Sequence, residues 1–228
     1  MINMGISSYI REERALTNLP DDLINSEEFA RELDDIELTY RSALSEITAK
    51  LDILSNNFKM MNSYVPIHHI QGRLKTFDSL MEKAGRYGIE DPLHNLNVVR
   101  EQVYDIAGIR VVCNYREDIY TISRLLMDQE DVRTVKVKDY CKNPKPSGYR
   151  SLHVVVEIPV FLVDGKKMVP VEIQFRTIAM DTWASLEHDL KYKNKGALSA
   201  DVKDQLQECA STLADVDVQM ERIRHKVF

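Results

Sequence analysis

Residues Met168 to Arg176 read MVPVEIQFR, and their alternation predicts a half-buried β-strand. Apolar side chains occupy every second position, as expected when they all face one side of a sheet. The other face carries Glu172, Gln174 and Arg176. A carboxylate on the same face as a guanidinium offers a general base or metal ligand near a phosphate-binding cation. This strand therefore indicates a catalytic sheet.

The chain before this strand contains a cationic turn, KDYCKNPKPSGYRSLH, from Lys138 to His153. Its cations are Lys138, Lys142, Lys145 and Arg150, and four like charges so close in sequence favour an anionic partner. Proline fixes φ and Gly148 permits positive φ, so the backbone can turn tightly toward a ligand. Tyr149 adds an aromatic face, and charge combined with stacking is typical of nucleotide recognition. The alternative is an exposed basic loop that only keeps the surface soluble.

A second apolar strand is predicted in the segment DIAGIRVVC, from Asp105 to Cys113. Asp105 stands at its entrance and suits magnesium, which takes one or two carboxylates together with substrate phosphates. Arg110 is in phase with Gly108 and must emerge at a sheet face, where its planar guanidinium can pair or stack. By spacing alone, a buried salt bridge between Asp105 and Arg110 explains the pattern equally well.

The segment from His68 to Lys83 is predicted as an amphipathic helix, because its apolar residues recur at helical spacing. The apolar stripe consists of Ile70, Leu74, Phe77 and Met81, and the polar residues off it include Arg73, Lys75, Ser79 and Lys83. Taken alone, such charges are usually solvated.

The remaining pattern predicts an α+β fold with a mixed sheet of about five strands, flanked by helices. A long helix over residues 26–58 carries an apolar stripe, and a last helix follows Gly196 with a stripe from Val202 to Met220. Strands are expected near 107–114, 132–138, 152–159 and 168–176, with a helix around 118–128. We divide the chain into an N-terminal helical extension (1–60), a synthetase domain (61–195) and a C-terminal oligomerisation helix (196–228).

Five motifs in register resemble the synthetase domain of the RelA/SpoT family, most closely its small single-domain alarmone synthetases. The motifs are RxKxxxS (Arg73, Lys75, Ser79), DIAGIRV (Asp105 to Val111), KPxGYRSLH (Lys145 to His153), VEIQFRT (Val171 to Thr177) and AMDTWASLEH (Ala179 to His188). The resemblance covers about Ile67 to Lys193. Ser147 stands where the family more often has asparagine. The implied fold is a nucleotidyltransferase-like sheet.

The resemblance implies transfer of the β,γ-pyrophosphoryl group of ATP to the 3′-hydroxyl of GDP or GTP, with Mg²⁺ as cofactor. Glu172 then acts as the base and a possible metal contact, and Asp105 as the principal magnesium ligand. Arg73 and Arg110 match the family's guanidinium pair that sandwiches adenine. The remaining ATP contacts are Ser79 and the phosphate-binding lysines Lys75, Lys83, Lys138, Lys142 and Lys145.

For the acceptor nucleotide, Tyr149 matches the family's guanine-stacking residue. The other GDP or GTP contacts implied are Lys145, Ser147, His153, Gln174 and Arg176. His153 could instead be a core histidine bonded to a backbone carbonyl. Arg176 and the helix start Met180-Asp181-Thr182-Trp183 are expected to support the same acceptor wall. Alternatively, Arg176 could pair with Glu187 or His188 rather than contact substrate. Trp183, Leu186 and Leu190 are at helical spacing, so the tryptophan is interpreted chiefly as core.

Composition is compatible with this interpretation. The net charge is −6, so general attraction to nucleic acid is not expected, and the three cysteines have no metal-binding spacing. No apolar stretch approaches the length needed to cross a membrane. We expect a soluble, cytoplasmic protein. His188-Asp189 resembles the HD pair of the family's hydrolases, but it lies within a synthetase motif, and about 60 N-terminal residues cannot hold a hydrolase domain, so we expect no hydrolase activity.

The terminal helices predict a homo-oligomer, and the small family members are typically tetramers. Product alarmone or single-stranded RNA could regulate the activity. Two other functions stay open: a related pyrophosphokinase acting on adenosine nucleotides or tRNA, and a catalytically silent nucleotide- or RNA-binding regulator. The residues Tyr149, His153 and Gln174 favour guanosine acceptors, while the presence of Asp105 and Glu172 argues against a silent protein.

Overall fold

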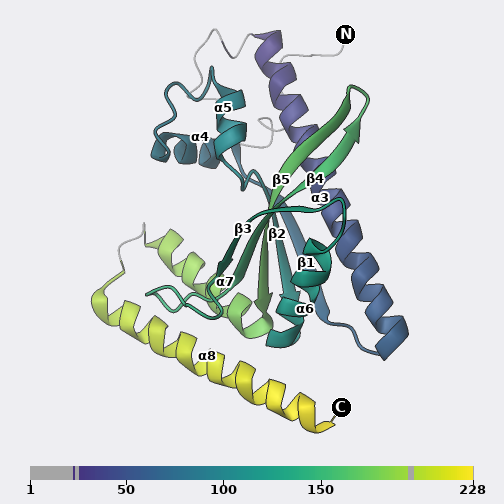
Figure 1. The fold of residues 1–228 in the computed structure, drawn as a ribbon. Coiled ribbons are helices and arrows are strands. Elements are labelled where there is room, and N and C mark those ends of the chain that lie inside the picture. The colour runs from purple at the N-terminus through teal and green to yellow at the C-terminus, as the bar shows by residue number, and fades with distance from the viewer. Residues whose placement is uncertain (1–22, 24–25, 195–197, 228) are drawn as a thin grey trace, which may run out of the picture. The chain divides into compact units, whose positions relative to one another are not determined.

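A computed structural model describes residues 23, 26–194 and 198–227 of the 228-residue chain. Six helices longer than one turn and five strands follow one another along the described chain in this order (Figure 1): α3 (Glu27–Asn62), β1 (Ile67–Leu74), α4 (Phe77–Arg86), α5 (Leu96–Gln102), β2 (Ala107–Cys113), α6 (Arg116–Met127), β3 (Arg133–Asp139), β4 (Leu152–Leu162), β5 (Gly165–Thr177), α7 (Ile178–Lys193) and α8 (Ala200–Val227). The α+β class predicted from the sequence is confirmed. No helix within these described ranges is both long and apolar enough to cross a membrane.

The five strands form one sheet in the order β1-β2-β5-β4-β3. Two turn residues join β4 to β5, so this pair is an antiparallel hairpin. Gly165, directly after the turn, has φ of +123°, a conformation that a side chain would strain. In β2 and β5 the buried residues alternate with half-buried ones over most of the strand, as their sequences predict. The strand order makes β2, which carries Arg110 and follows Asp105, a neighbour of β5, which carries Glu172 and Arg176.

The strand β1 corrects the prediction of one helix over His68–Lys83. The helix α4 begins only at Phe77, after Thr76, whose side chain caps it by accepting a hydrogen bond from the Ser79 amide. The apparent helical spacing thus came from two consecutive elements. β1 lies at an edge of the sheet and is exposed along most of its length, so it needs no strict alternation of apolar residues.

The chain folds as two compact units that divide α3 between Ile47 and Thr48. The first comprises Met1–Ile47, Gly72–Gly108 and Glu157–Glu172. Within this unit Phe29 packs edge-to-face on Phe77, and the stripe of α3 is buried as predicted at Leu33, Ile36 and Tyr40. Asp35 on the same helix pairs with Arg100 at 3.3 Å and with Lys167 at 2.8 Å. These contacts tie α3 to α5 and to β5.

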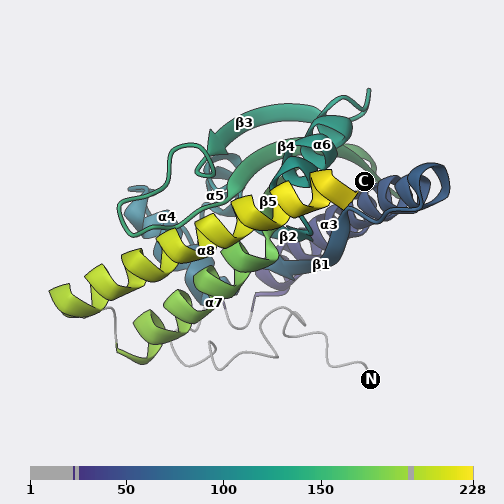
Figure 2. The same ribbon diagram turned by 90° about the horizontal axis from the view of Figure 1, so that it is seen from below.

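The second unit comprises Thr48–Gln71, Ile109–Val156 and Ile173–Phe228. In it α7 and α8 lie side by side (Figure 2). Trp183 is buried between them and donates its indole N–H to the carbonyl of Leu206. The prediction that Trp183 is core is confirmed, but Leu186 and Leu190, at helical spacing from it, are exposed.

The packing of α8 also corrects part of the predicted subunit interface. Leu206, Ala210 and Leu213 pack on the Trp183 and Ala184 side of α7 within the same chain. A methyl group added to Gly148 would lie 2.6 Å from the Cβ of Ala210, so glycine is required where α8 approaches the cationic turn. This half of the apolar stripe of α8 therefore belongs to the chain's own core. Its C-terminal half, from Val216 onward, carries exposed apolar residues.

Candidate functional site

In the first unit, Asp105 is held by two lysines. Its Oδ2 atom lies 3.1 Å from Nζ of Lys75 and 2.8 Å from Nζ of Lys83. Lys75 follows the end of β1, Lys83 stands on α4, and Asp105 precedes β2, so three elements converge on one carboxylate. All three side chains are less than a quarter exposed. We call Lys75, Lys83 and Asp105 the Asp105 cluster; the sequence predicted each of its members.

The second oxygen of Asp105, Oδ1, is buried and has no hydrogen-bond partner among the described residues. A buried carboxylate oxygen without a donor is costly unless a cation or a donor completes it. A hard divalent ion prefers such an oxygen, and magnesium commonly has one or two protein carboxylates together with substrate phosphates. The described residues contain no group of three or more acidic, histidine or cysteine ligands. Asp105 therefore fits a metal that is held mainly through a nucleotide.

Two further predicted ATP contacts lie in the first unit. Arg73 on β1 runs alongside Gly108 on β2, where an added methyl group would be 3.9 Å from its Cγ. Its side chain is exposed, as a stacking guanidinium must be. The Ser79 hydroxyl accepts a hydrogen bond from Oγ1 of Thr76 at 2.7 Å, so it takes part in the cap of α4. Glu172 on β5 is half-buried between the buried residues Val171 and Ile173, which matches the predicted alternation.

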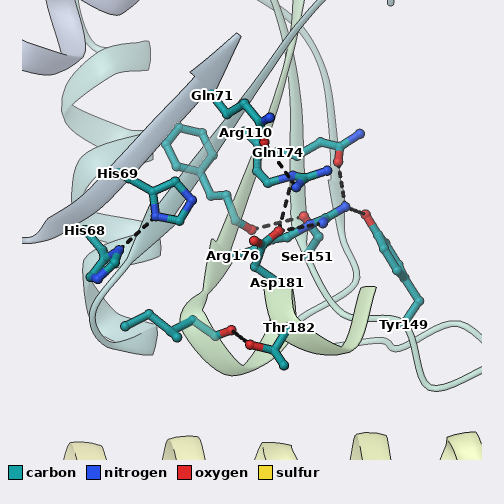
Figure 3. A network of polar contacts seen from close by, with 12 residues as sticks. His68, His69, Gln71, Arg110, Tyr149, Ser151, Gln174, Arg176, Asp181 and Thr182 are labelled. Carbon is teal, nitrogen blue, oxygen red and sulfur yellow. Dashed lines mark hydrogen bonds and ion pairs between the residues drawn. The ribbon is translucent and has the colours of Figure 1, made fainter. Parts of the chain in front are cut away.

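In the second unit, a network of polar side chains surrounds Arg176 (Figure 3). One terminal nitrogen, Nη1, donates to Asp181 Oδ1 at 3.0 Å, and the other, Nη2, donates to the Tyr149 hydroxyl at 2.8 Å and to Gln174 Oε1 at 2.7 Å. The same Asp181 oxygen lies 3.2 Å from Nε of Arg110. We call Arg110, Tyr149, Gln174, Arg176 and Asp181 the Arg176 cluster. It brings together predicted residues from β2, the cationic turn and β5.

These ion pairs answer two questions that the sequence left open. Asp105 pairs with Lys75 and Lys83, and Arg110 pairs with Asp181, so each residue of the possible Asp105–Arg110 salt bridge has other partners. The suggested pairing of Arg176 with Glu187 is wrong, because Glu187 pairs with Lys191 one turn further along α7. Asp181, in the first turn of α7, takes that place instead.

The cationic turn is closed as its proline and glycine predict. The Gly148 amide donates to the Lys145 carbonyl at 2.8 Å, and Gly148 has φ of +90°. Arg150 donates a hydrogen bond to the backbone carbonyl of Cys141. This bond joins the two ends of the loop, so Arg150 has a structural role. Burial raises the pKa of the Cys141 thiol to about 12, so that side chain is a neutral packing group.

The aromatic face of Tyr149 is shared with cations and other rings. Nζ of Lys145 lies 4.8 Å from the ring centroids of both Tyr149 and Tyr140, and the Arg176 guanidinium lies 5.2 Å from that of Tyr149. His153 is half-buried, with Nε2 2.8 Å from the Tyr149 hydroxyl. The Tyr149 hydroxyl is therefore one partner of His153, and its role toward the acceptor nucleotide stays a prediction.

The remaining predicted cations are exposed. Lys138 lies on the edge strand β3, and Nζ of Lys142 lies 5.2 Å from the ring centroid of Tyr120. Ser147 is half-buried within the turn. No role was predicted from the sequence for Gln71 or Tyr140, although Gln71 Oε1 accepts from Arg110 at 3.4 Å. Asp181 was expected only as part of the helix start that supports the acceptor wall, and its ion pair with Arg176 agrees with that expectation.

Comparison with known proteins places this geometry in a family. The family model for the region found in RelA / SpoT proteins matches residues 72–197, more than half of the chain. The chain belongs to the RelA/SpoT family. It is 38% identical to the GTP pyrophosphokinase YwaC of Bacillus subtilis over 93% of this chain and 98% of that protein. It is 39% identical to the GTP pyrophosphokinase YjbM of the same organism over 82% of this chain and 86% of that one.

The fold of a family member agrees with this assignment. The crystal structure of small alarmone synthetase 1 from Bacillus subtilis, bound to its product pppGpp, superimposes with a TM-score of 0.78. The two sequences are 37% identical, and the match covers 86% of this chain and 98% of the other. The resemblance inferred from five motifs is thus confirmed over nearly the whole length of these relatives.

Proposed function

We propose that this chain transfers the β,γ-pyrophosphoryl group of ATP to the 3′-hydroxyl of GDP or GTP and releases AMP. The observation that carries the proposal is the Asp105 cluster, in which two lysines share one carboxylate oxygen and leave the other buried without a partner. Such an arrangement offers cations to phosphates and an oxygen ligand to a metal. The pyrophosphokinase relatives and the pppGpp-bound structure support the same reaction.

On the donor side, we assign the ATP phosphates to Lys75 and Lys83, together with the loop and strand lysines Lys138, Lys142 and Lys145. Arg73 and Arg110 are assigned to the faces of the adenine. Asp105 would hold Mg²⁺, which when bound supplies positive charge against the phosphate oxygens. Ser79 would add a hydroxyl near the phosphates once its bond with Thr76 is exchanged.

On the acceptor side, Glu172 is assigned as the general base. In the transfer it removes the proton of the 3′-hydroxyl, the oxygen forms a bond to the β-phosphorus, and the bond from that phosphorus to the oxygen of AMP breaks. Tyr149 would stack on guanine, with Ser147, His153, Gln174 and Arg176 orienting the nucleotide. Lys145 lies over the Tyr149 ring in the structure, so stacking requires this lysine to move from the ring toward phosphate.

One assay tests the proposal. Purified protein is incubated with Mg²⁺ and ATP labelled on the γ-phosphate, together with GDP, GTP, AMP or tRNA, and the products are separated. Label in a guanosine product is expected. Label in AMP or tRNA would instead indicate one of the related pyrophosphokinases, and nucleotide binding without transfer would indicate a silent regulator. The Glu172→Gln variant serves as the control, because it is expected to bind nucleotide without transferring label.

We also propose that the exposed half of α8 joins copies of the chain into a homotetramer. Val216, Met220, Ile223 and Val227 recur at helical spacing and are 43–67% exposed. Val216→Asp together with Met220→Asp should yield a smaller species by light scattering, while Ser211→Asp on the opposite side of α8 should not. A wild-type monomer at micromolar concentration would contradict the proposal. The cytoplasmic location, the role in the stringent response, the three domain boundaries and regulation by alarmone or RNA stay predictions.

A further inference from the structure

Asp181 uses one oxygen for two guanidiniums. Its Oδ1 lies 3.0 Å from Nη1 of Arg176 and 3.2 Å from Nε of Arg110 (Figure 3). Under the proposed function, on which this inference rests, Arg110 serves the adenine of ATP and Arg176 serves the acceptor nucleotide. A single carboxylate oxygen is therefore shared by residues assigned to the two different substrates.

The position of Asp181 is fixed by the start of α7. Thr177 caps this helix, because its Oγ1 accepts from the Met180 amide at 3.1 Å. The same hydroxyl donates to Oδ2 of Asp217 on α8 at 2.6 Å, and both Thr177 and Asp217 are buried. A carboxylate in the first turn of a helix is also stabilised by the helix dipole. Asp181 thus stands on a rigid support while its two partners belong to strands.

The two guanidiniums differ in their exposure to solvent. The Arg176 side chain is 6% exposed and its two terminal nitrogens are bonded to Asp181, Tyr149 and Gln174, whereas that of Arg110 is 32% exposed. Two like charges that share one counter-charge influence each other, because a shift of one changes the field at the oxygen that holds the other. Arg110 also donates to Gln71 Oε1 at 3.4 Å, its greater exposure makes it accessible to a ligand, and Asp181 connects it to Arg176.

We propose that Asp181 is a positioning residue that couples binding of ATP to binding of the guanosine acceptor. When adenine orders Arg110, the Asp181 oxygen is held in the position that orients Arg176, and through it Tyr149 and Gln174. The coupling is reciprocal, since each ligand must change the affinity for the other by the same factor. A purely structural ion pair at the start of a helix would stabilise the fold without linking the two affinities.

The test measures binding without turnover. Calorimetry gives the Kd of a non-hydrolysable ATP analogue with and without saturating GDP, and the Kd of GDP with and without the analogue. For the wild type we expect each ligand to strengthen the other by about 5-fold or more. Asp181→Asn keeps the shape but removes the charge, and should reduce this factor to less than about 2-fold. The matched control is Asp189→Asn on the same helix, where the exposed pair with Lys193 is lost and coupling should persist.

A second variant keeps the inference testable if Asp181→Asn destabilises the fold. Arg110→Gln leaves Asp181 in place and removes a residue assigned only to adenine. GDP affinity, measured with no ATP analogue present, should nevertheless weaken by about 3- to 10-fold, because Asp181 loses one of its two partners. Combined with Asp181→Asn, the Arg110→Gln change should have no additional effect on GDP affinity.

The outcomes separate this inference from the proposed function. Wild-type coupling that survives Asp181→Asn, or GDP affinity unchanged by Arg110→Gln, would overturn the role of Asp181 even if the enzyme makes product. Absence of coupling in the wild type would overturn it as well. A wild type that couples the two nucleotides through Asp181 but transfers no label would instead contradict the reaction while leaving the coupling intact.

Discussion

The Asp105 cluster and the Arg176 cluster differ in the kind of buried polar atom that has no hydrogen-bond partner among the described residues. In the first cluster it is an acceptor, Oδ1 of Asp105, whereas the second contains a donor of this kind, Nε of Arg176. An incomplete acceptor beside two lysines suits a metal ion. An incomplete donor within a network of fixed side chains suits an oxygen of an oriented nucleotide.

The side chains that surround Asp105 also differ from those that surround Arg176. Asp105 is held by two flexible ammonium groups, which present point charges without directional demands. Arg176 is held by a carboxylate, a phenol and an amide through its planar fork, which fixes its direction. This difference supports the proposal that the first cluster supplies charge for the transferred phosphates and the second supplies geometry for recognition.

The largest expected effect comes from Glu172→Gln. The substitution keeps the size of the side chain and removes the base, so turnover should fall about 100-fold or more while ATP binding stays within a few-fold. Steady-state kinetics with an ATP-binding titration checks this, with the exposed Glu82→Gln on α4 as control. Near-normal turnover would show that charge and geometry suffice, and the base assignment would be wrong.

Asp105→Asn should weaken the first cluster as a metal site. Its lysines lose their counter-charge and the metal loses a carboxylate, so the Mg²⁺ concentration for half-maximal ATP binding should rise about 10- to 100-fold. The exposed Asp78→Asn should leave it unchanged. If Mg²⁺ dependence survived in Asp105→Asn while only the acceptor affinity fell, the two clusters would have been assigned the wrong way round.

Tyr149→Ala should act on the acceptor and spare ATP. Loss of base stacking costs roughly 1–3 kcal/mol, so KM for GDP and GTP should rise about 5- to 100-fold. Tyr149→Phe keeps the ring but loses the hydroxyl that accepts from Arg176, and should have a smaller effect of the same kind. Equal damage to both substrates would instead point to collapse of the cationic turn, and the exposed Tyr192→Ala controls for nonspecific effects.

The smallest effect concerns the support of the Arg176 cluster by α8. Burial raises the pKa of Asp217 above its ordinary value of 3.8, so the folded state favours the protonated form. Stability from this group is therefore full below the unfolded pKa and is lost as pH rises through the folded pKa. The Tm of the wild type should therefore fall as pH rises. In Asp217→Asn this fall should be smaller by a few degrees, whereas in the exposed Asp215→Asn it should equal that of the wild type. If Tm fell equally with pH in Asp217→Asn and in the wild type, Asp217 would make no contribution to the pH dependence of stability.

The sequence by itself determined the strands and helices that bury one face and expose the other. The alternation of MVPVEIQFR and of DIAGIRVVC gave β5 and β2, since a half-buried strand must alternate, and the stripe of α3 gave its buried face. The Lys145–Gly148 turn was predictable because proline and glycine restrict local backbone angles. In the Asp105 cluster, Lys75 and Asp105 were named from motifs, which record residue types regardless of packing, and Lys83 was named as a cation off the apolar stripe of the same segment.

Only the tertiary structure decided what depends on neighbours far along the chain. Edge strand β1 is mostly exposed and so carries no periodic signal, and its residues passed for the start of a helix. The sharing of Asp181 between two guanidiniums depends on the meeting of β2, β5 and α7, which no local pattern records. The division of α8 into a packed and an exposed half depends on α7 and Gly148, because burial is a property of what lies opposite and not of the helix's own spacing.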